Sequence, residues 1–197
     1  MTRVSTRRSG RAKGVERERT IVSAAFELLT EGGLAALTTS ALAARAGVSK
    51  ATVYQIWSNK TDLLVGALDH AYQQISVEDM GDFEAELRAF LGKRYAQYAS
   101  PGWDRLLASL VGASAEDPLV EKAFREWVAK QVGGHRVIIE RAIARGQLPA
   151  DADVDTISSF IAAPGVYRLV WEGMVPDETI IDATLCTVRA LARTPKS

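Results

Sequence analysis

Residues 37–64 read LTTSALAARAGVSKATVYQIWSNKTDLL, and this stretch decides the fold. Its pattern predicts one short helix over residues 40–45 and a second over residues 50–57. Between them lies Ala-Gly-Val at residues 46–48, where Gly47 permits the positive φ of a tight turn. Two short helices joined by such a turn predict a helix-turn-helix.

The caps and the small core of this motif can also be assigned. Thr38 or Thr39 caps the first helix, and Ser49 caps the second, because their hydroxyls accept from the free N–H groups of the first turn. Leu42, Val48 and Val53 can form the small core between the helices. The second helix is therefore expected to bury one face and present its polar face to solvent.

That polar face matches the groups that read DNA in the major groove. Lys50 can bond guanine, Gln55 can pair with adenine, and the Ala51 methyl can touch a thymine methyl. Tyr54 offers a hydroxyl to phosphate, and residues at helix N-termini favour an anion. The predicted DNA contacts are Thr39, Ser40, Ser49, Lys50, Ala51, Thr52, Tyr54, Gln55 and Lys60.

Charge is distributed unevenly along the chain, although its formal net charge is zero. Residues 1–60 carry ten Lys and Arg against four Glu, so the rest of the chain is acidic. A basic head on an acidic body is expected when one end meets phosphate. Seven of the ten cations precede residue 20, and residues 1–14 are expected to form a flexible basic arm. The arm either contacts DNA or has no specific role.

Outward from the motif, the pattern stays helical. Apolar residues recur at helical spacing from Glu16 to Gly33, from Asn59 to about Val77, and in five segments after Gly81. Gly133-Gly134 is expected to interrupt or end one segment and Pro164-Gly165 to kink another. No alternating strand pattern is present. The sequence predicts an all-α chain: an arm over 1–14, a DNA-binding head over 15–60, and a ligand-binding and dimerisation body over 61–197.

The run AGVSKATVYQIWSNKTDLL, residues 46–64, resembles the signature of the TetR family of bacterial transcriptional regulators. The resemblance is most specific over Thr38–Leu64 and covers residues 16–65 closely. It implies DNA contacts at Thr39, Ser40, Lys50, Thr52, Tyr54, Gln55 and Lys60. Family members often carry a basic residue where this chain has Gln55, and Phe where it has Trp57. The first departure leaves the preferred base open.

The resemblance also implies a ligand cavity among the middle helices and a dimer formed by the last two helices. The expected lining residues are Trp103, Leu107, Phe124, Trp127, Val128, Tyr167 and Trp171. Each of them, taken alone, also suits an ordinary core. The three tryptophans suggest an apolar or aromatic small molecule.

The function expected from these observations is a homodimeric repressor that reads a palindromic operator of double-stranded DNA and releases it on binding a ligand. A regulator controlled by a protein partner, without a small molecule, is the first alternative. A helical enzyme is the second, but phosphate-binding glycine loops and nucleophile motifs are absent, so no catalytic residue is assigned.

Few residues suit a metal, since the chain has one cysteine and two histidines, and no metal or cofactor is expected. No apolar run reaches the length of about 18 residues that a membrane helix needs. We therefore expect a cytoplasmic protein without a membrane partner.

Overall fold

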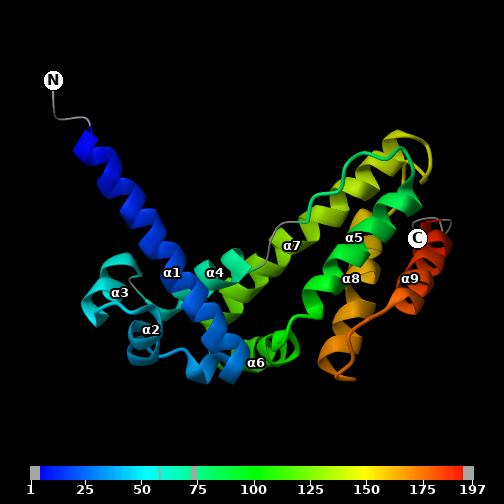
Figure 1. Cartoon of the computed structure of the whole chain (residues 1–197). Helices are drawn as coiled ribbons and strands as arrows, with labels where there is room; N and C mark the ends of the chain where they lie inside the picture. Colours follow the sequence, from blue (N-terminus) through cyan, green and yellow to red (C-terminus); the bar gives the residue numbers. More distant parts are fainter. Residues whose placement is uncertain (1–4, 58, 72–74, 193–197) are drawn as a thin grey trace. The chain divides into compact units, whose positions relative to one another are not determined.

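A computed structural model of the chain describes the backbone of residues 5–57, 59–71 and 75–192, with the side chains of all these residues except 5–13, 60, 70 and 71. The described residues form α-helices and no strand (Figure 1), which confirms the all-α prediction. The helices are α1 (Ser5–Ala36), α2 (Thr39–Ala46), α3 (Lys50–Ile56), α4 (Lys60–Ala71), α5 (Phe83–Tyr98), α6 (Trp103–Glu116), α7 (Pro118–Ala144), α8 (Val154–Val170) and α9 (Glu178–Ala192).

The chain divides into two compact units. The first unit comprises residues 1–73 and 108–127, and the second comprises residues 74–107 and 128–197. Helix α4 lies in the first unit with α1. It packs against α1, and its leucines at positions 63, 64 and 68 are buried.

The core of the first unit forms where α1 meets α2 and α4. Ile21, Ala25 and Leu29 are fully buried on α1, at the spacing of one helix face. The helix begins at Ser5, ahead of the predicted start at Glu16, so residues 5–14 of the expected arm are helical. Its regular geometry is broken at Gly33, whose φ is 65°, as the Gly32-Gly33 pair predicts.

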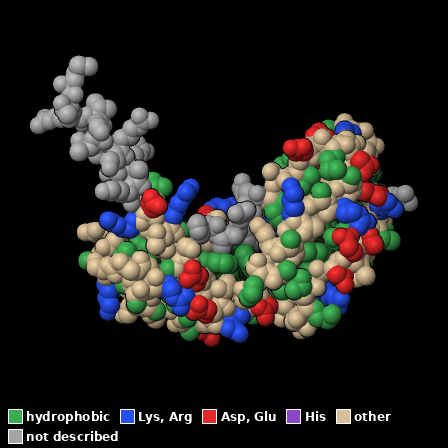
Figure 2. Space-filling model, viewed as in Figure 1, with side chains coloured by type: hydrophobic (Ala, Val, Ile, Leu, Met, Phe, Trp, Pro, Cys, Tyr) green, Lys and Arg blue, Asp and Glu red, His purple; other side chains and the backbone are tan. Residues whose placement is uncertain are grey.

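The second unit packs α9 against both α5 and α8 (Figure 1). The α8 backbone comes close to α5 at Gly165, where an added Cβ would lie 2.6 Å from Tyr95 Cε1. Helix α8 continues through Pro164 to Val170. Acidic and basic side chains lie intermixed on the face of this unit that Figure 2 shows. Arg88 of α5 pairs with Glu178 of α9 at 2.8 Å.

Two helical predictions are corrected. Helix α4 ends at Ala71 and the described residues 75–81 are not helical, so the helix does not reach Val77 as expected. Helix α7 runs without interruption through Gly133-Gly134. The glycine at 134 serves packing instead of helix termination, because a Cβ there would lie 2.8 Å from Phe90 Cε2.

Candidate nucleic-acid interface

Helix α2 and the turn after it have the geometry predicted from the sequence. Thr38 is the cap, since the Ala41 N–H donates to Thr38 Oγ1 at 3.2 Å. Gly47 ends the helix in the left-handed region, with φ 65° and ψ 32°. The N–H of Val48 then donates to the Ala43 carbonyl at 3.0 Å, closing the turn. These bonds orient the next helix.

Helix α3 begins at a second cap. The Thr52 N–H donates to Ser49 Oγ at 3.1 Å, and the two hydroxyls lie 2.9 Å apart. Leu42 of α2 is fully buried and Val53 of α3 is 4 % exposed, so these residues form the predicted core between the helices. Ser49 and Thr52 are thus engaged with each other at the start of α3.

The opposite face of α3 is open to solvent. Lys50, Ala51, Tyr54 and Gln55 are all exposed, and Tyr54 is the most prominent at 62 % exposure. These four positions follow the i, i+1, i+4, i+5 spacing of one helix face, opposite Val53. This face is mostly polar, and the major groove of DNA is wide enough to admit an α-helix.

A contact between helices joins two of the predicted phosphate ligands. Thr39 Oγ1 donates to the Tyr54 hydroxyl at 3.4 Å, which links the N-terminus of α2 to the exposed face of α3. Ser40, beside Thr39, is exposed in the first turn of α2. The structure therefore brings two hydroxyls and the free N–H groups of a helix N-terminus to one place, an arrangement suited to an anion.

Helix α4 starts with two capping residues that bind each other. The Asp62 N–H donates to Asn59 Oδ1 at 2.8 Å, and Asn59 Nδ2 donates back to Asp62 Oδ2 at 2.8 Å. Lys60 is the first residue of α4, and its side chain lies outside the described residues. Its predicted phosphate contact stays a prediction.

Two positioning features of this region were missed at the level of sequence. Arg45 donates to Glu31 Oε2 at 2.7 Å and to Glu27 Oε2 at 3.2 Å. The hydrogen bond from Arg45 to Glu31 lowers the pKa of Glu31. The Arg45 charge therefore holds α2 to α1, although the sequence count included it among the cations facing phosphate. Gly66 allows the Trp57 ring to lie against α4, since a Cβ there would be 2.3 Å from Trp57 Cη2. Neither partner is close in sequence, so no local pattern reveals them.

The residues expected to line a ligand cavity belong to both units. Two aromatic pairs are stacked: Phe124 with Trp127 in the first unit, and Tyr167 with Trp171 in the second. The seven residues differ in burial: Trp103, Leu107 and Trp127 are buried, Phe124 is half-buried, and Val128, Tyr167 and Trp171 are exposed.

Two described cavities lie elsewhere, both within the second unit. The larger, about 350 Å³, lies among residues 75–77, α5 and α7; the smaller, about 200 Å³, lies beside the N-terminus of α5 and the end of α9. None of the seven residues lines either one. Their role in ligand binding stays a prediction.

The described residues contain no group of three or more His, Cys, Asp or Glu side chains that could hold a metal ion. Among the same residues, no helix is both long enough and apolar enough to cross a membrane.

Comparison with protein families gives two matches. Residues 21–67 match the family described as bacterial regulatory proteins, tetR family. Residues 77–188 match the family described as tetracyclin repressor-like, C-terminal domain. The first match contains α2, α3 and the turn between them, and the second contains α5 to α8 and most of α9.

Individual relatives agree with these matches. The chain is 30 % identical over 169 residues to the uncharacterized HTH-type transcriptional regulator YdeS of Bacillus subtilis, covering 83 % of each chain. It is 29 % identical over 191 residues to the DNA-binding transcriptional repressor TetR of Mycobacteroides abscessus, covering 92 % of this chain and 99 % of that one.

Solved structures show the same fold. The TetR family transcription regulator SCO0332 superposes with a TM-score of 0.71 at 27 % identity, over 90 % of this chain and 97 % of that one. The regulator FadR from Bacillus subtilis, solved in complex with stearoyl-CoA, has a TM-score of 0.61 over 88 % of this chain and 97 % of that one. At 18 % identity, the second likeness shows the fold alone.

Proposed function

Because this chain belongs to the TetR family of transcriptional regulators, which are not enzymes, we propose that it is a sequence-specific repressor released from its operator by a small molecule. Repression is supported by the relative from Mycobacteroides abscessus, which is named a DNA-binding transcriptional repressor. Since its target is the chromosome, the protein acts in the cytoplasm.

The observation that carries the DNA-binding part is the exposed polar face of α3 beside the Thr39–Tyr54 contact. In this proposal Lys50 and Gln55 reach base edges, while Tyr54 and Thr39 bind one phosphate between them. Ala51 supplies a methyl contact, and the Ser49 cap, with its contact to Thr52, holds the start of α3 in place. Ser40 and Lys60 add phosphate contacts at the N-termini of α2 and α4.

The protein acts as a homodimer in this proposal, because one short helix reads few bases. A two-fold dimer would read a palindrome whose half-sites lie about 34–36 Å apart. Support comes from α8 and the residue that ends it: Phe160, Tyr167 and the C-cap residue Trp171 are 44 %, 55 % and 63 % exposed in the single chain. Large apolar side chains exposed together mark a protein interface.

Control by a ligand is supported by the 350 Å³ cavity of the second unit, which has the size of small-molecule sites. A ligand that prefers one of two body conformations shifts the dimer between them, by no more than its difference in affinity for the two. We propose a DNA-binding head over residues 15–60 and a ligand-binding and dimerisation body over residues 61–197.

The test is fluorescence anisotropy of the purified protein with DNA from upstream of its own gene, measured across a salt series. The variant Lys50→Ala/Tyr54→Ala/Lys60→Ala is compared with Lys122→Ala, an exposed lysine of α7. We expect tight binding that weakens steeply with salt, a loss of about 100-fold in the triple variant, and no change in Lys122→Ala.

If wild type and triple variant both bind this DNA no more tightly than random DNA, fragments of the genome are selected for binding to the protein. If no fragment is selected, sequence-specific DNA binding is wrong for this chain.

A further inference from the structure

The two ends of α3 are held by different contacts. At its start, the Ser49 cap fixes the first turn, and the buried Val53 lies where α3 packs on α2. At its end, the Trp57 N–H donates to the Val53 carbonyl at 2.9 Å. Trp57 then leaves the helix with φ −123° and ψ 113°. Its backbone therefore marks the point at which α3 stops.

The side chain of Trp57 lies against Gly66 of α4. A Cβ built at position 66 would lie 2.3 Å from Trp57 Cη2, 2.9 Å from Cζ3 and 3.0 Å from Cζ2. These three atoms form the outer edge of the six-membered ring. The indole thus occupies the space that a side chain at position 66 would need, and the two residues fit only while position 66 is glycine.

Helix α4 gives this contact a fixed support. It packs on α1, and Leu63, Leu64 and Leu68 are buried in the first unit. Ala67, the residue after Gly66, is fully buried as well. Because α4 is held by this core, the ring that lies on Gly66 fixes the end of α3 to the same core.

Shape and not hydrogen bonding holds the indole. Trp57 Nε1 is buried and has no hydrogen-bond partner among the described residues. A buried N–H without an acceptor is costly, so the fit of the ring must offset that cost. A smaller aromatic ring at position 57 would lose contact area on α4 but no hydrogen bond from the side chain.

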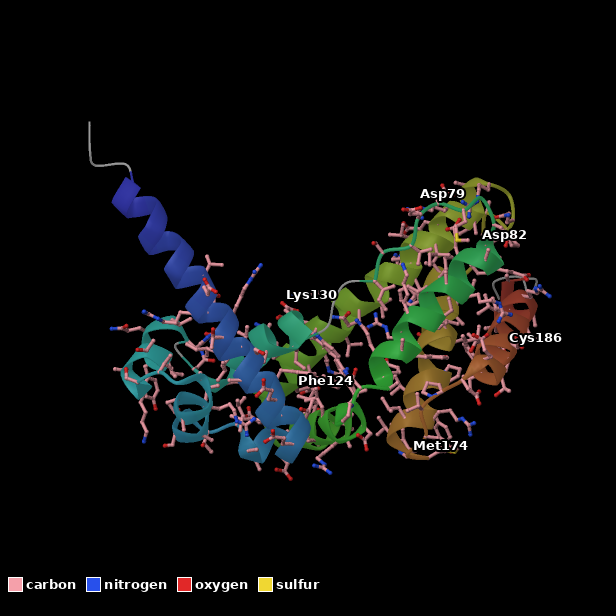
Figure 3. All side chains as sticks on the ribbon, in the orientation of Figure 1. Asp79, Asp82, Phe124, Lys130, Met174 and Cys186 are labelled. Atoms are coloured by element: carbon pink, nitrogen blue, oxygen red, sulfur yellow. The ribbon has the colours of Figure 1, made fainter. Side chains whose placement is uncertain are left out.

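The residues of the DNA-facing surface nearest to this contact are Tyr54 and Gln55. Both are exposed in the last turn of α3, whereas Lys50 lies beside the capped start of the helix. Figure 3 shows side chains of α3 extending outward from the ribbon. A shift of the end of α3 moves Gln55 more than Lys50. Hydrogen bonds to base edges need a defined geometry, but attraction to phosphate depends on it much less.

We infer that Trp57 and Gly66 are positioning residues for sequence readout: the Trp57 ring, seated on Gly66, fixes the end of α3 so that Gln55 meets its base. The inference rests on the proposed DNA binding and names the pair that sets its specificity. Both residues act through α3, without contacting DNA themselves.

The test is fluorescence anisotropy of full-length variants with operator DNA and with random duplex DNA of the same length. Gly66→Ala adds a methyl group that forces the ring to move. It should weaken operator binding about tenfold, the loss of roughly one base contact, and change binding to random DNA by less than about twofold. Gly112→Ala, in α6 of the same unit, is the matched control, because its methyl would meet no atom within 4 Å.

A second substitution relieves the clash. In Gly66→Ala/Trp57→Phe the shorter ring no longer reaches the new methyl group, so operator affinity should return to within about threefold of wild type. Urea denaturation of each variant shows that it is folded at the assay temperature. A merely structural role would lower the unfolding midpoint of Gly66→Ala and leave the ratio of operator affinity to random-DNA affinity unchanged.

The inference is overturned if folded Gly66→Ala binds operator within about twofold of wild type, or if the double variant binds as weakly as Gly66→Ala. If Gly66→Ala does not fold, Trp57→Leu is measured, since it removes the ring without adding an atom. It should weaken operator binding about tenfold, and an unchanged affinity in the folded variant overturns the inference.

The same measurements separate this inference from the proposed function. A wild type that prefers no operator contradicts the proposed function and this inference with it. A wild type that binds its operator, with an affinity that these variants leave unchanged, contradicts the positioning role alone.

Discussion

In the first unit, the polar side chains of α3 are exposed, with Tyr54 at 62 %, whereas the second unit encloses polar groups in its interior. All the buried polar and charged side chains among the described residues belong to the second unit: Glu86, Arg94, His135, Ser158 and Thr184. Exposed polar groups cost little to keep and are free to meet DNA. Buried ones are costly, so they indicate fixed internal contacts or a bound ligand.

The largest expected effect on stability comes from removing the buried carboxylate of Glu86. Glu86→Ala should lower the free energy of unfolding by about 4 kcal/mol, because Arg141 and Arg145 lose the carboxylate between them. Urea denaturation measures it. Glu178→Ala, which removes an exposed partner of Arg88, should have little effect. Equal losses of stability in the two variants would contradict the view that the buried carboxylate contributes more than the exposed one.

The next effect is a dependence on pH. In the folded chain the pKa of His135 is about 4, below its ordinary value of 6.5, because the imidazole is buried and Arg94 is near. Between these values the unfolded chain binds a proton that the folded chain excludes, so stability falls as pH falls from 6.5 towards 4. We expect a loss of about 2 kcal/mol by pH 5 from this residue.

Urea denaturation at pH 7 and pH 5, with His135→Gln as the comparison, measures this contribution. The variant should lose about 2 kcal/mol less than wild type over the same interval. A wild type and a variant with the same pH dependence would contradict a buried neutral histidine.

Two neighbouring glycines on α7 provide a smaller and more selective test. Gly134→Ala should cost about 2 kcal/mol, because the Cβ would lie 2.8 Å from Phe90. Gly133→Ala should instead stabilise by about 0.5–1 kcal/mol, since nothing lies within 4 Å of its Cβ and alanine favours a helix. Thermal and urea unfolding of both variants measure the difference, and effects of the same sign would contradict the packing described here.

The smallest expected effect concerns Tyr54 on the exposed face of α3. Tyr54→Phe removes the hydroxyl that Thr39 contacts and should weaken operator binding by about fivefold, with unfolding unchanged, because the ring is exposed. Anisotropy with operator DNA measures the affinity. Lys122→Ala, at an exposed site of α7, is the control. A change in unfolding without a change in affinity would assign the Thr39–Tyr54 contact to stability.

The exposed face of α3 was largely predictable from sequence. Thr38, Ser49 and Gly47 act on backbone groups within a few residues, so local rules apply to them. The helix boundaries they set decide that Val53 points inward and Tyr54 outward. The ion pair between Arg45 and Glu31 was not predictable, because the packing of α2 on α1 brings these residues together.

The second unit was less predictable for the same reason. Trp103 is buried whereas Trp171 is 63 % exposed, a difference that helical spacing alone does not predict. The larger cavity of this unit is lined in part by Arg94, a residue type that usually lies at the surface. Only the packing of α5 in this unit buries it.

The sequence by itself determined the all-α class, the helix-turn-helix with its caps and turn, and the face of α3 directed to solvent. These follow from interactions between residues a few positions apart. The tertiary structure alone decided that α7 continues through two glycines, that Glu86 and His135 are buried, and that cations line a cavity. Each of these features depends on contacts between segments that are distant in sequence, such as Gly134 against Phe90. Such contacts are decided by close packing in the interior and not by the local sequence pattern.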